Sequence, residues 1–283
     1  MTTALTRLAG SAFEITITVP WADIKKIYDE VFEELAAEME VEGFRKGKAP
    51  RDLIEGKVDK SKIYGEVVNR ILPESYAKAL EEHSIKPVIS PKVQITSADQ
   101  DKDWQFIARS AEKPSVTLGN YQDAVKTINA SGKIWTPGQK AEEKKDDEER
   151  SKKVSAIIDK LLEVCQVELA EILIESEVNR LLSALIDDVR QAGLTYEQYL
   201  TSSNQTADKV KEKYLKQAQT ALKLEFILEA VANDLDIKVS ETEINAVIDK
   251  EPDPTKKQAL KDQSYLLASI LRRENTLTKL LAL

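Results

Sequence analysis

The chain has 283 residues, and its 41 Lys and Arg against 49 Asp and Glu give a formal net charge of −8. At roughly 150 residues per domain, this length predicts two domains. A hydrophobic content of 42% excludes a disordered chain, and 9 Gly with 9 Pro exclude a collagen-like one. One cysteine, Cys165, excludes an internal disulfide, and one histidine, His83, excludes a histidine-based metal cage.

The first predicted elements are a strand and a helix. Residues 12–19, AFEITITV, place apolar side chains on one face at a period of two, which predicts a half-buried strand ended by Pro20. From Asp23 to about Met39 the apolar positions follow helical spacing, and acidic residues crowd the opposite face. The next segment, GFRKGKAP at 43–50, has two glycines and a final proline and is predicted to be a loop.

Pro50 suits the first turn of a short helix, and a longer amphipathic helix is predicted from about Ser61 to Ser84. Strands return in KPVISPKVQIT, where prolines punctuate the run, and around Trp104 to Ala108. The order of strand, helices and strands predicts an α+β domain over residues 1–112.

Residues 113–150 are predicted to connect two domains, because KPSVTLGNYQDA and ASGKIWTPGQ have the composition of connecting chain. From Lys140 to Lys153, 12 of 14 residues are charged, six of each sign. Balanced charge favours a solvated helix over a self-repelling tail.

From about Ser151 the chain is predicted to be almost entirely helical, which makes 151–283 an all-α domain. Thr195 with Gln198, and Ser240 with Glu243, have the spacing of capping boxes at helix starts. Two prolines at 252 and 254 interrupt the pattern before a last helix predicted over about 255–283.

The chain offers little catalytic chemistry. Metal sites need several His, Cys or converging carboxylates, so we expect none, and no cofactor. His83 is expected to cap or pack near a helix end, and Cys165 to be a small core residue; a Cys–His catalytic pair is the alternative, without a local signature. GFRKGKA is not a phosphate-binding loop, because its glycine spacing is one residue short and Ala49 replaces the required hydroxyl.

Charge is unusual around this loop. Seven basic residues lie between Gly43 and Lys62 against three acidic ones, a local balance of +4 in a chain of −8. A cationic tip with the exposed aromatic Phe44 suits docking on RNA phosphates and an acidic protein patch, because the cations supply charge and the ring supplies an apolar anchor. A solvated loop is the alternative.

GFRKGKAP, followed by a helix and by ILPESYAKALEEHSIKPVISPKV, resembles the ribosome-binding domain of the bacterial chaperone trigger factor. VELAEILIESEVNRLL, GLTYEQYL and LEFILEAVANDLDIKVSETEI resemble the family's helical substrate-binding domain, in the family's order. The resemblance implies an elongated, multi-domain chain with an α+β ribosome-binding domain and an all-α C-terminal domain. Ala170 stands where the family usually has proline.

The resemblance also implies which residues meet the ribosome. They match the family loop that contacts ribosomal protein and RNA beside the exit tunnel, and they are Gly43, Phe44, Arg45, Lys46, Gly47 and Lys48. The family usually carries a peptidyl-prolyl isomerase domain of about a hundred residues between its two other regions. Only 120–150 occupies that interval here, so this domain is expected to be missing.

The function that follows is a ribosome-associated, ATP-independent holdase in the cytoplasm, without catalysis. Its expected partners are the ribosome near the exit tunnel, unfolded nascent polypeptides and, weakly, a second copy of itself; no membrane is expected. One alternative is retained isomerase activity, against which the mostly polar 120–150 segment counts, since such catalysis needs an apolar, aromatic-lined pocket. Another is an RNA-binding adaptor without clients, against which the overall acidity counts.

Overall fold

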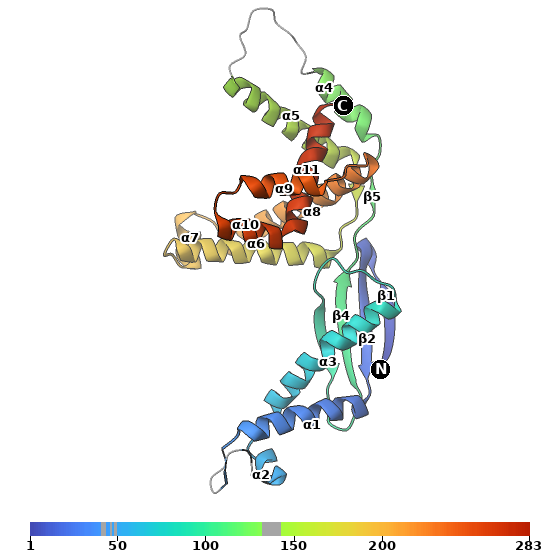
Figure 1. Ribbon diagram of the computed structural model, residues 1–283, viewed down its shortest axis with the longest axis vertical. Coiled ribbons are helices and arrows are strands. Elements are labelled where there is room, and N and C mark those ends of the chain that lie inside the picture. Colours follow the sequence, from blue (N-terminus) through green and yellow to red (C-terminus); the bar gives the residue numbers. More distant parts are fainter. Residues whose placement is uncertain (41–43, 46, 48–49, 132–142) are drawn as a thin grey trace, which may run out of the picture. The chain divides into compact units, whose positions relative to one another are not determined.

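The computed structural model describes residues 1–40, 44–45, 47, 50–131 and 143–283 (Figure 1). By its internal contacts the chain divides into two compact units. The first unit contains Met1–Lys113 with Ala170–Leu173, and the second contains Pro114–Leu169 with Ile174–Leu283. An α+β region is therefore followed by a mostly helical one, which confirms the predicted fold class.

The first unit is a four-stranded antiparallel sheet, in the order β1-β2-β4-β3, with helices on one face. Its strands are β1 (Thr2–Arg7), β2 (Ala12–Val19), β3 (Lys92–Ser97) and β4 (Trp104–Ala111). Its helices are α1 (Trp21–Glu38), α2 (Arg51–Glu55) and α3 (Lys60–Glu82), with a short 3-10 turn at Ala9–Ser11. The strand at 12–19 and the three helices agree with the sequence prediction.

Alternation along β2 builds the first core. Phe13, Ile15 and Ile17 are fully buried, and Trp104 and Phe106 of β4 join them. Because side chains alternate across a strand, one face of the sheet is apolar and is covered by α1 and α3. The edge strand β1 was missed from the sequence, since TTALTR has no apolar alternation and is held by its backbone pairing with β2.

The second unit is helical, with a single two-stranded ribbon of β5 (Val116–Thr117) and β6 (Gln166–Val167) among its described residues. Its helices are α4 (Tyr121–Ser131), α5 (Glu143–Val164), α6 (Glu171–Gln191), α7 (Tyr196–Ser202), α8 (Ala207–Asp234), α9 (Glu241–Lys250), α10 (Pro254–Asp262) and α11 (Ser264–Leu281). Both capping boxes, at Thr195 and Ser240, are formed as predicted.

The described part of 113–150 differs from the expected connecting segment. Tyr121 and Val125 of α4 lie in the core of the second unit, and the Tyr121 hydroxyl donates to Asp234 Oδ2 at 2.6 Å. Asn129 Nδ2 donates to the Leu280 carbonyl at 2.9 Å. The composition of 113–131 is that of a loop, but Tyr121 and Val125, four residues apart, give α4 an apolar face that packs on α5, α8 and α11. Residues 132–142 lie outside the described residues.

The single helix predicted over about 255–283 is also wrong. Two helices, α10 and α11, meet at Gln263, whose φ of −105° and ψ of 26° interrupt the α geometry. Prediction failed because Lys261 and Asp262 continue a helix-compatible composition through the break, without a glycine or proline to mark it.

Candidate functional site

The loop that carries the site residues joins α1 to α2. Helix α1 ends where Met39 takes extended backbone angles, and α2 begins after Pro50. Of the residues named from the sequence, the structure describes Phe44, Arg45 and Gly47; Gly43, Lys46 and Lys48 lie outside the described residues. We call residues 43–48 the docking loop.

Gly47 fixes the path of this loop. Its φ is +71°, a left-handed conformation that side chains disfavour, and its N–H donates to the Met39 carbonyl at 3.4 Å. A Cβ at this position would lie 2.8 Å from the Ala37 carbonyl oxygen, closer than real Cβ atoms approach. Only glycine therefore lets the loop return this closely to the end of α1.

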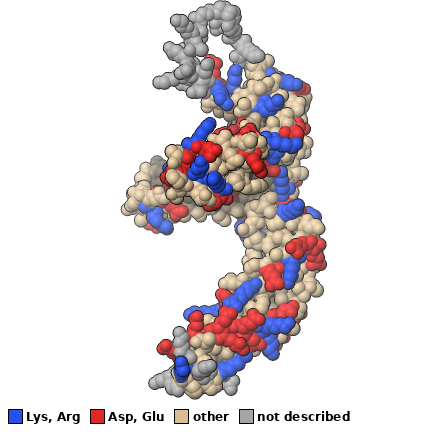
Figure 2. Space-filling model, viewed as in Figure 1, with Lys and Arg blue, Asp and Glu red and all other residues tan. Residues whose placement is uncertain are grey.

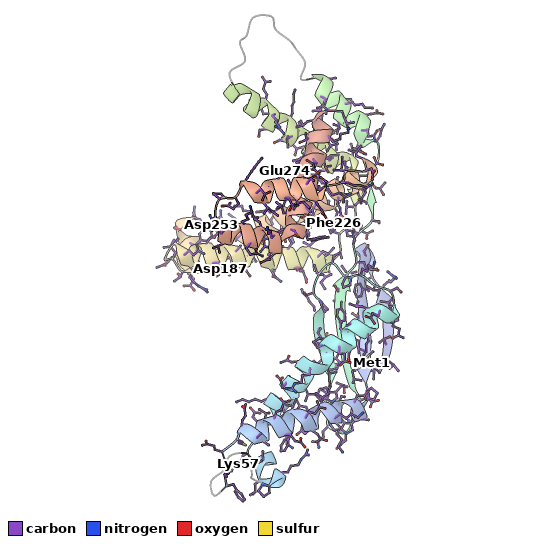
Figure 3. All side chains as sticks on the ribbon, viewed as in Figure 1. Met1, Lys57, Asp187, Phe226, Asp253 and Glu274 are labelled. Carbon is purple, nitrogen blue, oxygen red and sulfur yellow. The ribbon has the colours of Figure 1, made fainter. Side chains whose placement is uncertain are left out.

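Phe44 and Arg45 are both open to solvent, and 44% of the Phe44 surface is exposed. The exposed phenyl ring can make an apolar contact with a partner, and the Arg45 guanidinium has five donors, none of which bonds to a residue that the structure describes. Three further exposed lysines follow α2 in the chain: Lys57, Lys60 and Lys62 (Figure 3 labels the first). This end of the first unit thus offers an aromatic ring together with several cations.

Arg51, one of the seven basic residues between Gly43 and Lys62, has a structural role. It forms an ion pair with Asp29, and its guanidinium lies 4.7 Å above the Phe32 ring centroid. Ile54, one turn later, is 3% exposed. These contacts hold α2 against α1, so Arg51 anchors the far side of the loop.

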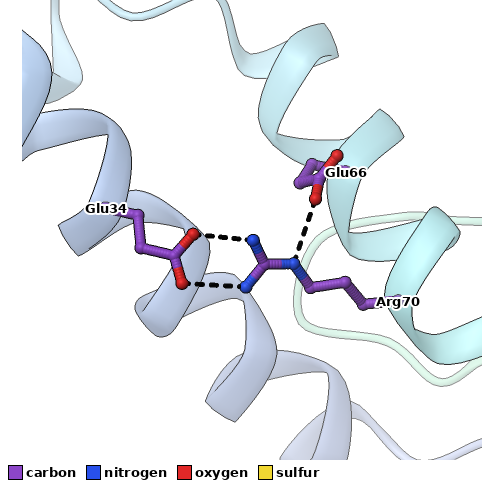
Figure 4. A network of polar contacts seen from close by, with 3 residues as sticks. All are labelled: Glu34, Glu66 and Arg70. Atoms are coloured by element: carbon purple, nitrogen blue, oxygen red, sulfur yellow. Dashed lines mark hydrogen bonds and ion pairs between the residues drawn. The ribbon is translucent and has the colours of Figure 1, made fainter.

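A charged brace joins the two long helices behind the loop (Figure 4). Arg70 of α3 donates through both terminal nitrogens to Glu34 of α1, at 2.6 and 3.0 Å, and through Nε to Glu66 at 3.0 Å. The hydrogen bonds from Arg70 lower the pKa of the Glu34 carboxyl. The Glu66–Arg70 contact could be predicted from the sequence, because the two residues are four positions apart on one helix. The contact between Arg70 and Glu34 could not, because they lie on different helices.

The second unit contains an open groove between α8 and α11, with a volume of about 560 Å³. We call it the apolar groove. Its lining residues are Glu225, Leu228, Glu229, Ala232, Val239, Tyr265, Leu266, Ala268, Ser269, Arg272, Arg273 and Thr276. Half of these twelve side chains are apolar or aromatic, and the charged ones are two glutamates of α8 and two arginines of α11.

Helix α11 presents unusually exposed apolar side chains at this groove. Tyr265 is 90% exposed and Leu266 53%, and Ile270 on the same helix is 44% exposed. The wall behind them is held in place, since Arg272 donates to the Ile237 carbonyl at 2.8 Å and to Asn233 Oδ1 at 2.7 Å. Sequence reasoning named none of these residues, because a leucine at helical spacing is core more often than surface.

The two residues with reactive side chains have structural roles. His83 caps the C-terminus of α3, and its Nε2 lies 2.9 Å from Thr3 Oγ1. Cys165 is buried in the second core and donates to the Leu118 carbonyl at 3.2 Å, and burial raises the pKa of its thiol. Both positions agree with the predicted roles.

Within the described ranges, no group of three or more His, Cys, Asp or Glu side chains could hold a metal ion. None of the helices in those same ranges combines the length and apolarity needed to cross a membrane.

Basic and acidic side chains alternate over the visible face of the first unit (Figure 2).

Family models match almost the whole chain. The model described as bacterial trigger factor protein matches residues 1–133, and the model for the trigger factor C-terminus matches residues 138–282. Residues 134–137 alone separate the two matches, which leaves no room between them for a domain of about a hundred residues.

Individual relatives are similar over less than half of the chain. Trigger factor of Staphylococcus epidermidis (strain ATCC 35984) is 36% identical over 122 residues, which are 43% of this chain and 28% of that protein. Trigger factor of Staphylococcus aureus (strain Newman) is 34% identical over the same shares of each chain. The chain therefore matches only about a quarter of the length of these relatives.

A solved structure is similar over both units. Its subject is "Promiscuous Substrate Recognition in Folding and Assembly Activities of the Trigger Factor Chaperone", and it aligns at a TM-score of 0.69 and 14% identity, over 100% of this chain and 99% of that chain. At this identity the similarity concerns the fold. Together with the two family models, it shows that the chain belongs to the bacterial trigger factor family.

Proposed function

We propose that the chain is an ATP-independent chaperone that docks on the ribosome through residues 43–48 and holds unfolded nascent polypeptides against its helical unit. The observation that carries the docking half is the exposed pair of Phe44 and Arg45, which lies close to Gly47 and its contact with the end of α1. An aromatic ring beside a guanidinium suits a mixed surface of ribosomal protein and RNA phosphates.

The apolar groove supports the client half of the proposal. Apolar segments of an unfinished chain bind exposed hydrophobic side chains reversibly, and Tyr265 and Leu266 are such side chains at the mouth of a groove. Release follows when the client buries the same segment in its own core, which requires no nucleotide.

Sedimentation with ribosomes that carry nascent chains tests the docking half, and suppression of light scattering by an unfolded client tests the holding half. We expect the chain to pellet with ribosomes at low salt and to release as salt rises, because part of the contact is to phosphate. Absence from the ribosome pellet at every salt concentration would overturn docking. Undiminished client aggregation at stoichiometric excess would overturn holding.

No peptidyl-prolyl isomerase activity is proposed. The two family models leave only residues 134–137 between them, and Tyr121, one of two aromatic residues between 120 and 150, is buried against the second core with its hydroxyl bonded to Asp234. It cannot line a prolyl pocket from there. Catalysis of prolyl isomerisation in a tetrapeptide at enzyme-like rates would contradict this. A cytoplasmic location, partly on ribosomes, is part of the same proposal.

A further inference from the structure

Helix α8 contains a second concentration of positive charge. Between residues 209 and 223 there are five lysines and one glutamate, a local balance of 5 − 1 = +4 in a chain whose net charge is −8. This equals the balance around the docking loop, but it lies in the helical unit. The five lysines are Lys209, Lys211, Lys213, Lys216 and Lys223.

Four of these lysines share one face. At about 100° per residue, Lys209, Lys213, Lys216 and Lys223 fall within an arc of about 80°, and they extend over roughly 21 Å of helix. All four side chains are exposed, and so is Thr220 within the same arc. We call these four residues the lysine face.

Part of the remaining surface of α8 is packed. Val210 is 1% exposed and Ala218 is fully buried, and from Phe226 onward the helix is buried on several sides (Figure 3 labels Phe226). The lysine face therefore ends where α8 enters the second core.

The cations of this face are only partly neutralised. Lys216 pairs with Glu212 at 2.8 Å, in a contact where both side chains are more than 60% exposed. Lys213 Nζ lies 5.9 Å from the Tyr214 ring centroid. Among the residues that the structure describes, the side chains of Lys209 and Lys223 have no carboxylate partner, so most of the charge remains available.

We propose that the lysine face binds the phosphate backbone of RNA, without reading its sequence. A row of point charges with only polar residues between them matches a regular row of phosphates and offers no apolar anchor for a peptide. The inference goes beyond the docking loop, and it rests on the proposed ribosome docking only for the source of the RNA. Two separated phosphate contacts on one chain would also strengthen each other by avidity.

Binding of a short fluorescent oligouridine to the full chain tests this, measured by anisotropy between about 50 and 200 mM salt. The variant changes all four lysines of the face to glutamine: Lys209→Gln, Lys213→Gln, Lys216→Gln and Lys223→Gln. We expect binding to weaken at least about tenfold, and the slope of log affinity against log salt to shrink by about 2 to 3, because single strands release roughly 0.7 ions per neutralised phosphate.

The matched control removes the same charge from dispersed, exposed lysines: Lys25→Gln, Lys26→Gln, Lys86→Gln and Lys279→Gln. An equal loss in the control, or unchanged affinity and slope in the lysine-face variant, would overturn the proposal. Loss of binding to polyglutamate without loss for oligouridine would overturn it in favour of an acidic protein partner. Because this assay uses RNA without ribosomes, its result does not depend on ribosome docking. Ribosome docking is tested separately, with the variants of Phe44 and Arg45.

Discussion

The docking loop and the apolar groove are exposed for opposite physical reasons. The loop is short and contiguous; its Gly47 adopts a left-handed backbone angle against the end of α1, and Arg51 holds the following helix on α1. The groove is assembled from α8, the segment before α9, and α11, and its shape depends on packing. The docking loop is therefore characterised by its charge and by one backbone angle, whereas the apolar groove is characterised by exposed apolar side chains.

The largest expected effect tests whether the loop alone carries docking. Changing Phe44, Arg45 and Lys46 together to alanine removes the exposed ring and two cations, and we expect ribosome co-sedimentation to fall below detection while circular dichroism stays unchanged. A matched control changes Val88, Lys25 and Lys26 to alanine, which removes one exposed apolar side chain and two exposed cations elsewhere in the first unit. Unchanged co-sedimentation of the folded loop variant would defeat the assignment.

A second test concerns the contribution of α4 to the stability of the second unit, which contains the groove. Because Tyr121 and Val125 are buried in the second core, a fragment 114–283 should unfold cooperatively, whereas 151–283 should lose several kcal/mol or fail to fold. Thermal unfolding followed by circular dichroism measures the difference. Equal stability of the two fragments would show that α4 is a passive connection after all.

How far the sequence could predict each region follows from this difference. The loop could be found because its chemistry is contiguous: Phe44, Arg45 and Gly47 lie within four positions, and a charge contrast marks them. The groove could not, because Leu228 and Leu266 come from helices far apart in the chain, and nothing in helical spacing separates a buried leucine from an exposed one. Likewise α4 was hidden by loop-like composition, although Tyr121, Val125 and Ile128 have helical spacing.

The third test isolates backbone geometry in the loop. Gly47→Ala adds a Cβ within 2.8 Å of a backbone oxygen at φ +71°, so we expect about 1 to 3 kcal/mol of strain, relieved by a moved loop, and about tenfold weaker ribosome binding. Gly65→Ala is the matched control. It lies in α3 with nothing within 4 Å of the added Cβ, and it should stabilise the first unit by about 0.5 to 1 kcal/mol without changing binding.

The fourth test asks whether the groove's apolar surface acts on clients. Tyr265→Ser and Leu266→Ser together should reduce suppression of client aggregation several-fold, with stability changed by less than about 0.5 kcal/mol per site because these side chains are exposed. The control makes the same change at Ile186 and Leu215, which are exposed but lie outside the groove lining. If the control reduces suppression equally, clients bind exposed apolar area in general and the groove has no special role.

The smallest expected effect belongs to the brace behind the loop. Arg70 lowers the pKa of the Glu34 carboxyl, so the ionised, bonded form stabilises the folded state above the unfolded pKa of Glu34, and this contribution is lost as pH falls through the folded pKa. Because the pair is exposed, Glu34→Gln should lower the melting temperature only slightly at neutral pH, and the difference from the parent chain should vanish in acid. Lys78→Gln, which breaks the more exposed Glu74–Lys78 pair within α3, is the control. If the brace positions the loop, the Glu34 variant should also weaken ribosome binding at neutral pH, whereas the Lys78 variant should not. If both variants weaken ribosome binding equally, the Glu34–Arg70 pair has no specific role in positioning the loop.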